Sequence, residues 1–195
     1  MKPARQTEEL RRLAIRFAEL LPFGGDVLEV GAGSDAIALA RATGMNLTAL
    51  NASRPAVEAG RRQAEKARVP VHFRHGNPGS MPFPDGAFDF VICRAPMKSF
   101  PDPMGVLREM RRVLRPGRRG VILNLRRDVP RQAVTRYVES LHTSFAENVL
   151  TFAKLRLQQR RNFTLRQLEA LLNQIPFASA RIDGTLIGVE VWFER

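Results

Sequence analysis

The sequence predicts an α/β domain with a mostly parallel sheet, because seven short apolar runs alternate with helical patterns along most of its length. The last two runs follow one another with only a short turn between them, which predicts a closing antiparallel hairpin. At 195 residues the chain can bury a substantial core. We therefore expect a single domain over residues 1–195, with helices on both faces of the sheet.

The first half of the chain shows the alternation clearly. Leu10, Leu13 and Phe17 recur at helical spacing, which predicts a helix over Thr7–Leu21. Ser53 is expected to cap a later helix, with Pro55 in the first turn, where a missing amide costs little. The expected elements after the first helix are strand Val27–Val30, helix Ala36–Ala42 ending near Gly44, strand Leu47–Leu50, the Ser53-capped helix to about Ala67, and strand Val71–Arg74.

The second half follows the same pattern up to residue 125. Arg115-Pro116-Gly117 is expected to stop a helix, and Thr164 with Gln167 forms a capping-box pattern that opens another. The expected elements are strand Phe88–Cys93, helix Pro103–Leu114, strand Val121–Leu125, a helix from Thr164 to about Ile175, and strands near Ala178–Asp183 and Leu186–Phe193 with a turn at Gly184.

Residues 126–163 interrupt this pattern and predict a helical insertion over the sheet. Phe145, Val149 and Phe152 fall at helical spacing among many cations. We expect the amphipathic stretch Phe145–Leu157 to pack on the sheet, with a dimer face or an anionic membrane surface as alternatives. Tyr137, Glu139 and His142 are candidates for facing a substrate, although structural or exposed roles are favoured.

The composition indicates a cytoplasmic protein. The only cysteine, Cys93, excludes an internal disulfide, and the N-terminus lacks the apolar core of a signal peptide. No apolar run approaches the roughly 20 residues that span a bilayer. The net charge of +12 would suit nucleic acid, but the arginines are spread over many segments, so nucleic-acid binding is the less favoured alternative.

A glycine turn after the first expected strand predicts a ligand site. Gly31-Ala32-Gly33 lets the backbone approach a ligand closely, and the helix that follows points its amides at anionic groups. Asn51 ends the second strand, where a polar side chain can meet ribose hydroxyls. Asn77 follows the third strand, where it can reach a base edge, and Arg94 ends the fourth strand beside the same crevice.

Three stretches carry a resemblance to a known family. They are Val27–Gly33, Met81–Asp89, and Phe100–Pro103 leading into Leu107–Gly117. In this order they resemble the class I S-adenosylmethionine-dependent methyltransferases, over about half of the chain. The resemblance implies a Rossmann-like seven-stranded sheet whose last strand is antiparallel, S-adenosylmethionine as the cofactor, and a small-molecule methyl acceptor.

The resemblance also implies a set of cofactor-binding residues. Glu29, Gly31 and Gly33 would line the methionine part, Asn51 and Ala52 would face the ribose, and Asn77 the adenine. The complete expected set is Glu29, Gly31, Ala32, Gly33, Asp35, Asn51, Ala52, Asn77 and Arg94. No catalytic residue is assigned, because methyl transfer to a good nucleophile can proceed by proximity and alignment. His72 and His75 point to opposite faces of a strand, so no metal site is expected.

The sequence departs from the family at three of these positions. Asp35 stands where the family usually has a third glycine, and Asn51 and Asn77 stand where it usually has acidic residues. Loss of charge at each asparagine is worth roughly 1 kcal/mol, which predicts weaker binding rather than its loss. Asp35 could attract the cofactor's sulfonium, repel its carboxylate, or simply cap the helix from Ala36.

Alternative functions follow from the same residues. The departures favour a non-catalytic binding module with a degenerate cofactor site as the main alternative. Residues 31–36 also fit the G-x-G-x-x-A pattern of a nicotinamide-dependent oxidoreductase. RNA methylation is less favoured, because Arg94-Ala95-Pro96-Met97 lacks the Asn/Asp-Pro-Pro-aromatic run of exocyclic-amine methylation. Cys93 is expected to pack in the core.

Overall fold

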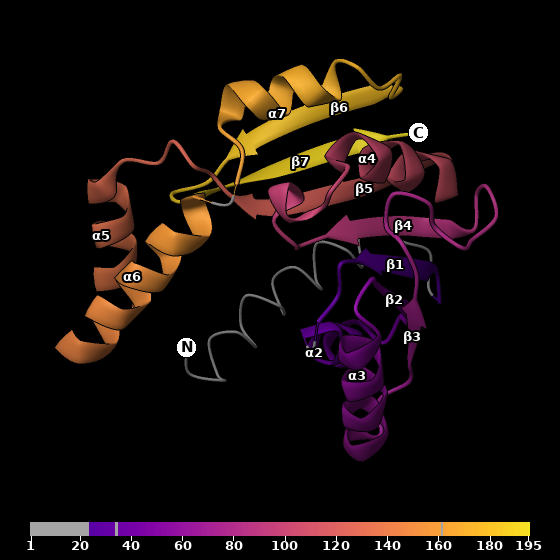
Figure 1. Cartoon of the computed structure of the whole chain (residues 1–195), viewed down its shortest axis with the longest axis horizontal. Helices are drawn as coiled ribbons and strands as arrows, with labels where there is room; N and C mark the ends of the chain where they lie inside the picture. Colours follow the sequence, from indigo (N-terminus) through magenta and orange to yellow (C-terminus); the bar gives the residue numbers. More distant parts are fainter. Residues whose placement is uncertain (1–23, 34, 161) are drawn as a thin grey trace.

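The computed structural model describes residues 24–33, 35–160 and 162–195, so the helix expected over Thr7–Leu21 lies outside the described residues (Figure 1). The elements are β1 (Asp26–Val30), α2 (Asp35–Thr43), β2 (Asn46–Asn51), α3 (Arg54–Ala67), β3 (Val71–His75), β4 (Phe88–Cys93), the short 3₁₀ helix η1 (Met97–Ser99), α4 (Pro103–Val113), β5 (Leu114–Leu125), α5 (Arg131–Glu139), α6 (Phe145–Arg160), α7 (Leu165–Leu172), β6 (Ser179–Gly184) and β7 (Gly188–Glu194).

The seven strands form one sheet in the order β3-β2-β1-β4-β5-β7-β6. Strands β1 to β5 pair in parallel, and β7 runs antiparallel to both β5 and β6. This confirms the predicted α/β class and the closing antiparallel hairpin. A dinucleotide-binding sheet has the order 3-2-1-4-5-6 without an antiparallel strand inserted beside the fifth. The topology therefore does not support the nicotinamide alternative.

Helices cover both faces of the sheet, as the nearly continuous apolar runs of β1 and β4 require. Leu28 and Val30 of β1 belong to a core cluster with α4 and α7, whereas Val27 belongs to a second cluster with α2 and α3. The structure also confirms two predicted helix N-termini. The Ser53 side chain accepts from the Ala56 amide, and Thr164 and Gln167 form a capping box.

Strand β5 begins earlier than predicted. The expected strand starts at Val121, but the observed strand starts at Leu114 and includes Pro116 and Gly117. Its pairing with β4 is irregular there, since the register shifts between Phe88 and Phe90, and Gly117 has a φ of 70°. A bulge of this kind accommodates a proline and a left-handed glycine that a regular ladder would exclude.

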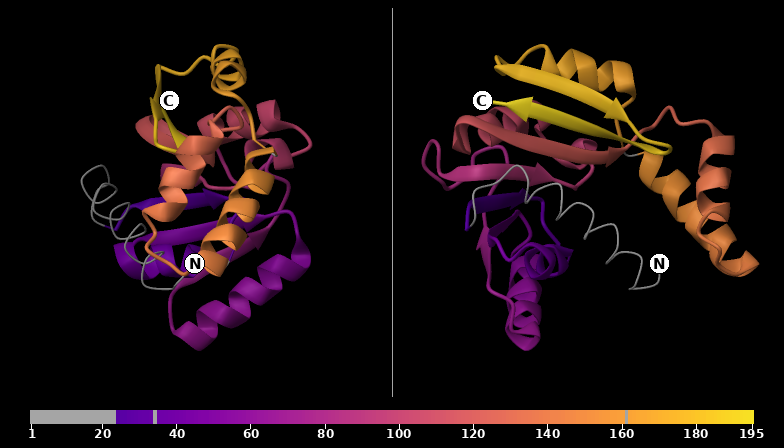
Figure 2. Two further views of the ribbon diagram at one scale, coloured as in Figure 1. Left: turned by 90° about the vertical axis from the view of Figure 1, so that its left-hand side faces the viewer. Right: turned by 180° about the vertical axis from the view of Figure 1, so that it is seen from behind.

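The insertion at residues 126–163 is helical, but the prediction that it lies over the sheet is wrong. Helices α5 and α6 form a hairpin that projects beyond the edge of the sheet (Figures 1 and 2). Val134 and Val138 of α5 are buried in a cluster of their own with Ile187, and Phe152 and Leu155 of α6 pack against it. Because α2, α3, α4 and α7 already cover the two faces, the two helices bury apolar surface on each other.

None of the helices in the described ranges has the length and apolar character needed to cross a membrane.

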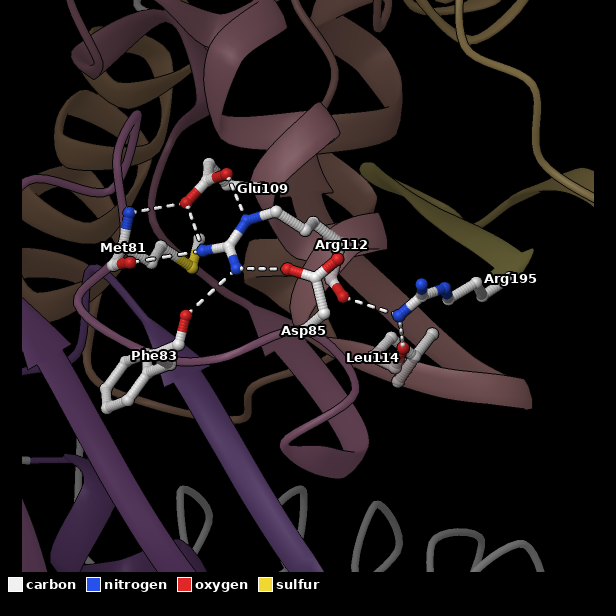
Figure 3. A network of polar contacts seen from close by, with 7 residues as sticks. All are labelled: Met81, Phe83, Asp85, Glu109, Arg112, Leu114 and Arg195. Atoms are coloured by element: carbon white, nitrogen blue, oxygen red, sulfur yellow. Dashed lines mark hydrogen bonds and ion pairs between the residues drawn. The ribbon is translucent and has the colours of Figure 1, made fainter.

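Arg112 of α4 holds the loop that precedes β4 (Figure 3). Its guanidinium donates to both carboxylate oxygens of Glu109 at 2.6 and 2.8 Å and to Asp85 at 2.7 Å. It also donates to the carbonyls of Phe83 at 2.9 Å and Met81 at 3.1 Å. Glu109 in turn accepts from the Met81 amide at 2.5 Å. Part of the Met81–Asp89 stretch that resembles the family therefore has a structural role. Asp85 holds the loop in place through its ion pair with Arg112.

A second ion-pair cluster, at the amino ends of β1 and β4, gives Asp89 a similar structural role. Asp89 is 6% exposed and pairs with Arg115, which also reaches Asp26 at 3.2 Å. Burial alone would raise the pKa of Asp89. The hydrogen bonds from Arg115 and the Asp26 amide, together with the charges of Arg115 and Arg118, hold that pKa below its ordinary range instead.

Glu109 is expected to make stability depend on pH in the acidic range. The hydrogen bonds from Arg112 hold the pKa of Glu109 below its ordinary value of 4.5. A carboxyl with a lowered pKa stabilises the fold above its unfolded pKa, and that contribution is lost as the pH falls through the folded value. In urea titrations below pH 4.5, Glu109→Gln should therefore lose less stability than the wild type. Identical slopes of unfolding free energy against pH would contradict this role.

Candidate cofactor site

The predicted site residues gather at the carboxyl ends of the parallel strands. The strand order reverses between β1 and β4, where the connections leave toward opposite edges of the sheet. In open α/β sheets the crevice at such a switch point is where ligands bind. Glu29 lies near the end of β1, the glycine turn follows β1, and Arg94 follows β4, so the structure brings them to this point.

The glycine turn is built tightly against its neighbours. The Gly31 and Ala32 amides both donate to the Leu50 carbonyl, at 2.9 and 3.1 Å, which ties the turn to β2. Gly31 has a φ of +71°, and a Cβ there would lie 2.6 Å from Cβ of Ala95. Only glycine fits this position, because it combines a left-handed backbone with a close approach of two loops.

Gly33 has the opposite environment. It is exposed, and a Cβ there would meet no atom within 4 Å. The turn is thus closed against the loop after β4 at Gly31 and open to solvent at Gly33. Asp35 is the first residue of α2. Its side chain is outside the described part of the chain, so the three roles expected for it remain predictions.

Glu29 and Arg94 form an ion pair beneath the turn. The Glu29 carboxylate is 2% exposed, and its Oε1 lies 2.7 Å from Nε and 2.5 Å from Nη2 of Arg94. A carboxylate this deep is expensive without a cationic partner. The pair also links β1 to the loop after β4 at the switch point, and its members are 65 residues apart in sequence.

Asn51 fastens the glycine turn to the start of α3. Its Nδ2 donates to the Ala32 carbonyl at 2.7 Å, and its Oδ1 accepts from the Ser53 amide at 2.8 Å. An aspartate could accept from Ser53 but could not donate to Ala32. The departure from the family's acidic residue therefore has a structural reason, because this chain uses the amide to hold its turn.

Ala52 and Asn77 lie farther along the same edge, and both are exposed. Oδ1 of Asn77 accepts from the Gly79 amide at 2.9 Å, inside a turn closed by the Ser80 amide. The Ala52 carbonyl lies 3.1 Å from Nε2 of His75. His75, at the end of β3, thus lies beside the loop that follows β2. The described residues contain no group of three or more His, Cys, Asp or Glu side chains that could hold a metal ion.

Asn124 is a second asparagine that holds a loop of the site by two hydrogen bonds to its backbone, and it was not predicted from the sequence. Its Nδ2 donates to the Ala95 carbonyl at 3.1 Å, and its Oδ1 accepts from the Met97 amide at 3.1 Å. It thereby holds the loop after β4, whose Ala95 forms the wall behind Gly31. A polar residue near the carboxyl end of a predicted buried strand was the available signal.

Cys93 is a core residue and not a nucleophile of the site. Its side chain is fully buried, and its Sγ lies 3.6 Å from the Ala95 carbonyl. Burial raises the pKa of the thiol to about 12, so the reactive thiolate is negligible at neutral pH. This confirms the predicted packing role.

Comparison with known proteins agrees with this geometry. Residues 28–122 match the family described as a methyltransferase domain. The demethylmenaquinone methyltransferase of Staphylococcus haemolyticus is 33% identical over 136 residues, which are 68% of this chain and 55% of that protein. The 27-O-demethylrifamycin SV methyltransferase of Amycolatopsis mediterranei is 36% identical over 118 residues, 57% of this chain and 43% of that protein. The chain thus spans about half the length of these curated relatives.

The same fold is found in solved structures. A SAM-dependent methyltransferase from Aquifex aeolicus superposes with a TM-score of 0.69 at 16% identity, covering 98% of this chain and 93% of the other. The sheet order, the switch-point site and the matching domain define a protein of the Rossmann-like methyltransferase fold. These similarities support the class I S-adenosylmethionine-dependent methyltransferases as the family that the chain resembles, in agreement with the sequence.

Proposed function

We propose that this protein transfers a methyl group from S-adenosylmethionine to a small-molecule acceptor. The observation that carries the proposal is the glycine turn, which is closed at Gly31, open at Gly33 and fastened by Asn51 at the β1–β4 switch point. The names of the two curated relatives, which concern a demethylated quinone and a demethylated rifamycin, support a small-molecule acceptor over a nucleic acid. We also propose a cytoplasmic location, because the one cysteine is buried and free.

The residues present fit the parts of this cofactor in order along the edge. The open turn at Gly33 and the Glu29–Arg94 pair would hold the methionine part. Ala52, with Asn51 behind it, would lie along the ribose, and the exposed Asn77 turn would lie along the base. The bound cofactor supplies an electrophilic methyl group on its sulfonium. The chain's own contribution is then to orient the reactants and exclude water, which can account for methyl transfer to a good nucleophile without a general base.

The acceptor would approach from the loop after β4. Lys98 lies there, with Nζ 5.0 Å from the centroid of the Phe163 ring, and Phe100 packs beside the glycine turn. The apolar rings and one cation suit a flat, partly apolar acceptor that carries negative charge.

A second candidate is a non-catalytic binding module of the same fold. It is favoured by the local hydrogen bonds of Asn51 and Asn77, which occupy side-chain groups that would otherwise face the cofactor. Calorimetric titration with S-adenosylmethionine and with its demethylated product separates the candidates. We expect saturable binding of both, and no heat of binding even at millimolar ligand would contradict the enzyme.

Asn51→Asp is expected to weaken cofactor binding rather than restore it. The carboxylate loses the 2.7 Å hydrogen bond to Ala32 and places an oxygen against that carbonyl. Losing a buried partner costs about 1–3 kcal/mol, so roughly a tenfold loss of affinity is expected, together with a lower free energy of unfolding.

The control for this test is Asn46→Asp, at the other end of β2. Asn46 also donates Nδ2 to a backbone carbonyl, that of Gly24 at 3.1 Å, but lies at the amino end of the strand. It should leave the calorimetric affinity unchanged. Tighter binding by Asn51→Asp would show instead that the family's acidic residue is simply missing here.

A further inference from the structure

Helix α6 exposes an apolar face that the fold leaves uncovered. Phe145 is 85% exposed, Val149 54%, Leu150 56% and Leu157 57%. Only one other large apolar side chain of the described residues, Leu186, is comparably exposed. The exposed residues Ala146 and Ala153 fall between them at helical spacing, so they form one continuous stripe. We call these six residues the α6 stripe.

The stripe is not the face by which α6 packs in the molecule. Phe152 and Leu155 pack toward α5, and Gln159 is 2% exposed. The α6 sequence is thus apolar on two sides, one of which contacts the hairpin and the other solvent. A contiguous row of exposed apolar side chains flanked by charged ones is typical of an interaction site.

The charge around the stripe indicates what it contacts. Residues 126–163 contain eight Lys and Arg and three Asp and Glu, a net charge of +5. Exposed cations such as Lys154 and Arg160 lie on α6 itself, and Arg131 and Arg136 on α5. A second copy would bring two hairpins of the same charge together within a chain of net charge +12. An anionic surface is complementary to both the charge and the apolar residues.

We propose that the α6 stripe docks on the surface of an anionic lipid bilayer, with α6 lying in the interface. At 16 residues the helix is shorter than the roughly 20 that span a bilayer, and its exposed Phe and Leu side chains lie beside Lys154 and Arg160, which can contact anionic headgroups. The hairpin extends past the carboxyl ends of the parallel strands, so docking holds the candidate cofactor edge near the lipid (Figure 2).

Vesicle flotation tests the proposal on the full chain. The protein should float with vesicles of mixed phosphatidylglycerol and phosphatidylcholine, more weakly at high salt, and not with phosphatidylcholine alone. Phe145→Ser with Leu150→Ser should lower vesicle affinity roughly tenfold or more, because each exposed side chain contributes apolar burial at the interface. The control is Leu186→Ser, which removes a leucine that is 50% exposed, against 56% for Leu150, and lies away from α6 at the β6–β7 turn.

Charge variants test the second part of the argument. Lys154→Gln with Arg160→Gln should lower affinity for anionic vesicles several-fold, whereas Arg62→Gln on exposed α3 should not. Absence of flotation, equal binding to neutral vesicles, or wild-type binding by the stripe variant would overturn the proposal. So would a dimer by light scattering that the stripe variant dissociates, because a second copy would then cover the stripe.

A further alternative to the lipid surface is that the chain's own residues 1–23 cover the α6 stripe. If they cover the stripe, the double serine variant should lower the unfolding temperature while the wild type fails to float. Cofactor titration without vesicles is independent of this test. Absence of cofactor binding would contradict the proposed methyltransferase activity but would not affect the proposed docking on lipid. Absence of flotation, with normal cofactor binding, would contradict only the docking on lipid.

Discussion

Replacing Gly31 by alanine is expected to lower the free energy of unfolding by about 2–5 kcal/mol and to remove measurable cofactor binding. A left-handed backbone costs a residue with a Cβ about 1–2 kcal/mol, and overpacking costs typically about 1–3 kcal/mol more. Here the added Cβ would lie 2.6 Å from Cβ of Ala95 and 3.1 Å from the Phe100 ring. The two loops at the switch point would have to separate. Urea denaturation and calorimetric titration measure the two effects.

Gly44→Ala is the matched control for this substitution. Gly44 has nearly the same backbone, with a φ of +66°, but a Cβ there would meet no atom within 4 Å. It lies after α2 and away from the carboxyl edge. Only the backbone cost of about 1–2 kcal/mol is expected, with unchanged cofactor affinity. If both variants lose the same stability and affinity, the close approach to Ala95 has no special role.

Arg112→Ala is expected to destabilise the fold by about 2–3 kcal/mol, which corresponds to a fall in Tm of roughly 5–10 °C. The guanidinium joins Glu109, Asp85 and the carbonyls of Met81 and Phe83, so its removal releases the loop before β4 and leaves Glu109 half-buried without its cation. Partial exposure of the side chains keeps the expected loss below that of a fully buried pair. Thermal unfolding followed by circular dichroism measures it.

Two further variants identify the cause of the loss. Arg108→Ala removes an exposed arginine from the same helix and should change stability by no more than about 0.5 kcal/mol. Arg112→Lys keeps the charge but not the planar fork, and should recover less than half of the stability. An Arg112→Ala variant as stable as Arg108→Ala would mean that the network contributes nothing.

The periodic parts of the fold could be predicted because their signals are local. The short apolar run Val27–Val30 predicts the buried strand β1, and the Ser53 cap and the Thr164–Gln167 capping box predict where two helices begin. The start of β5 was misjudged, since a proline and a glycine end a helix by local rules. A bulge let the strand continue through them, and the register with β4 that permits it is a long-range property.

The candidate site could be predicted in position but not in its contacts. The glycine turn, Asn51, Asn77 and Arg94 all lie at strand ends, and parallel strands bring such ends to one edge. What they contact depends on loops that meet only in the folded chain. Nothing in the sequence pairs Arg94 with Glu29, or directs the Asn51 amide to the Ala32 carbonyl. Asn124 went unnoticed for the same reason.

The sequence by itself determined the order of strands and helices, the closing hairpin and the glycine turn, because each depends on residues close together in the chain. Tertiary structure alone decided how the asparagines are used and where the insertion lies. Residues 145–160 are apolar enough to form a helix that buries one face, but the pattern does not say which surface is still available. Since other helices already cover the sheet, α6 packs on α5, and its second apolar face is exposed to solvent.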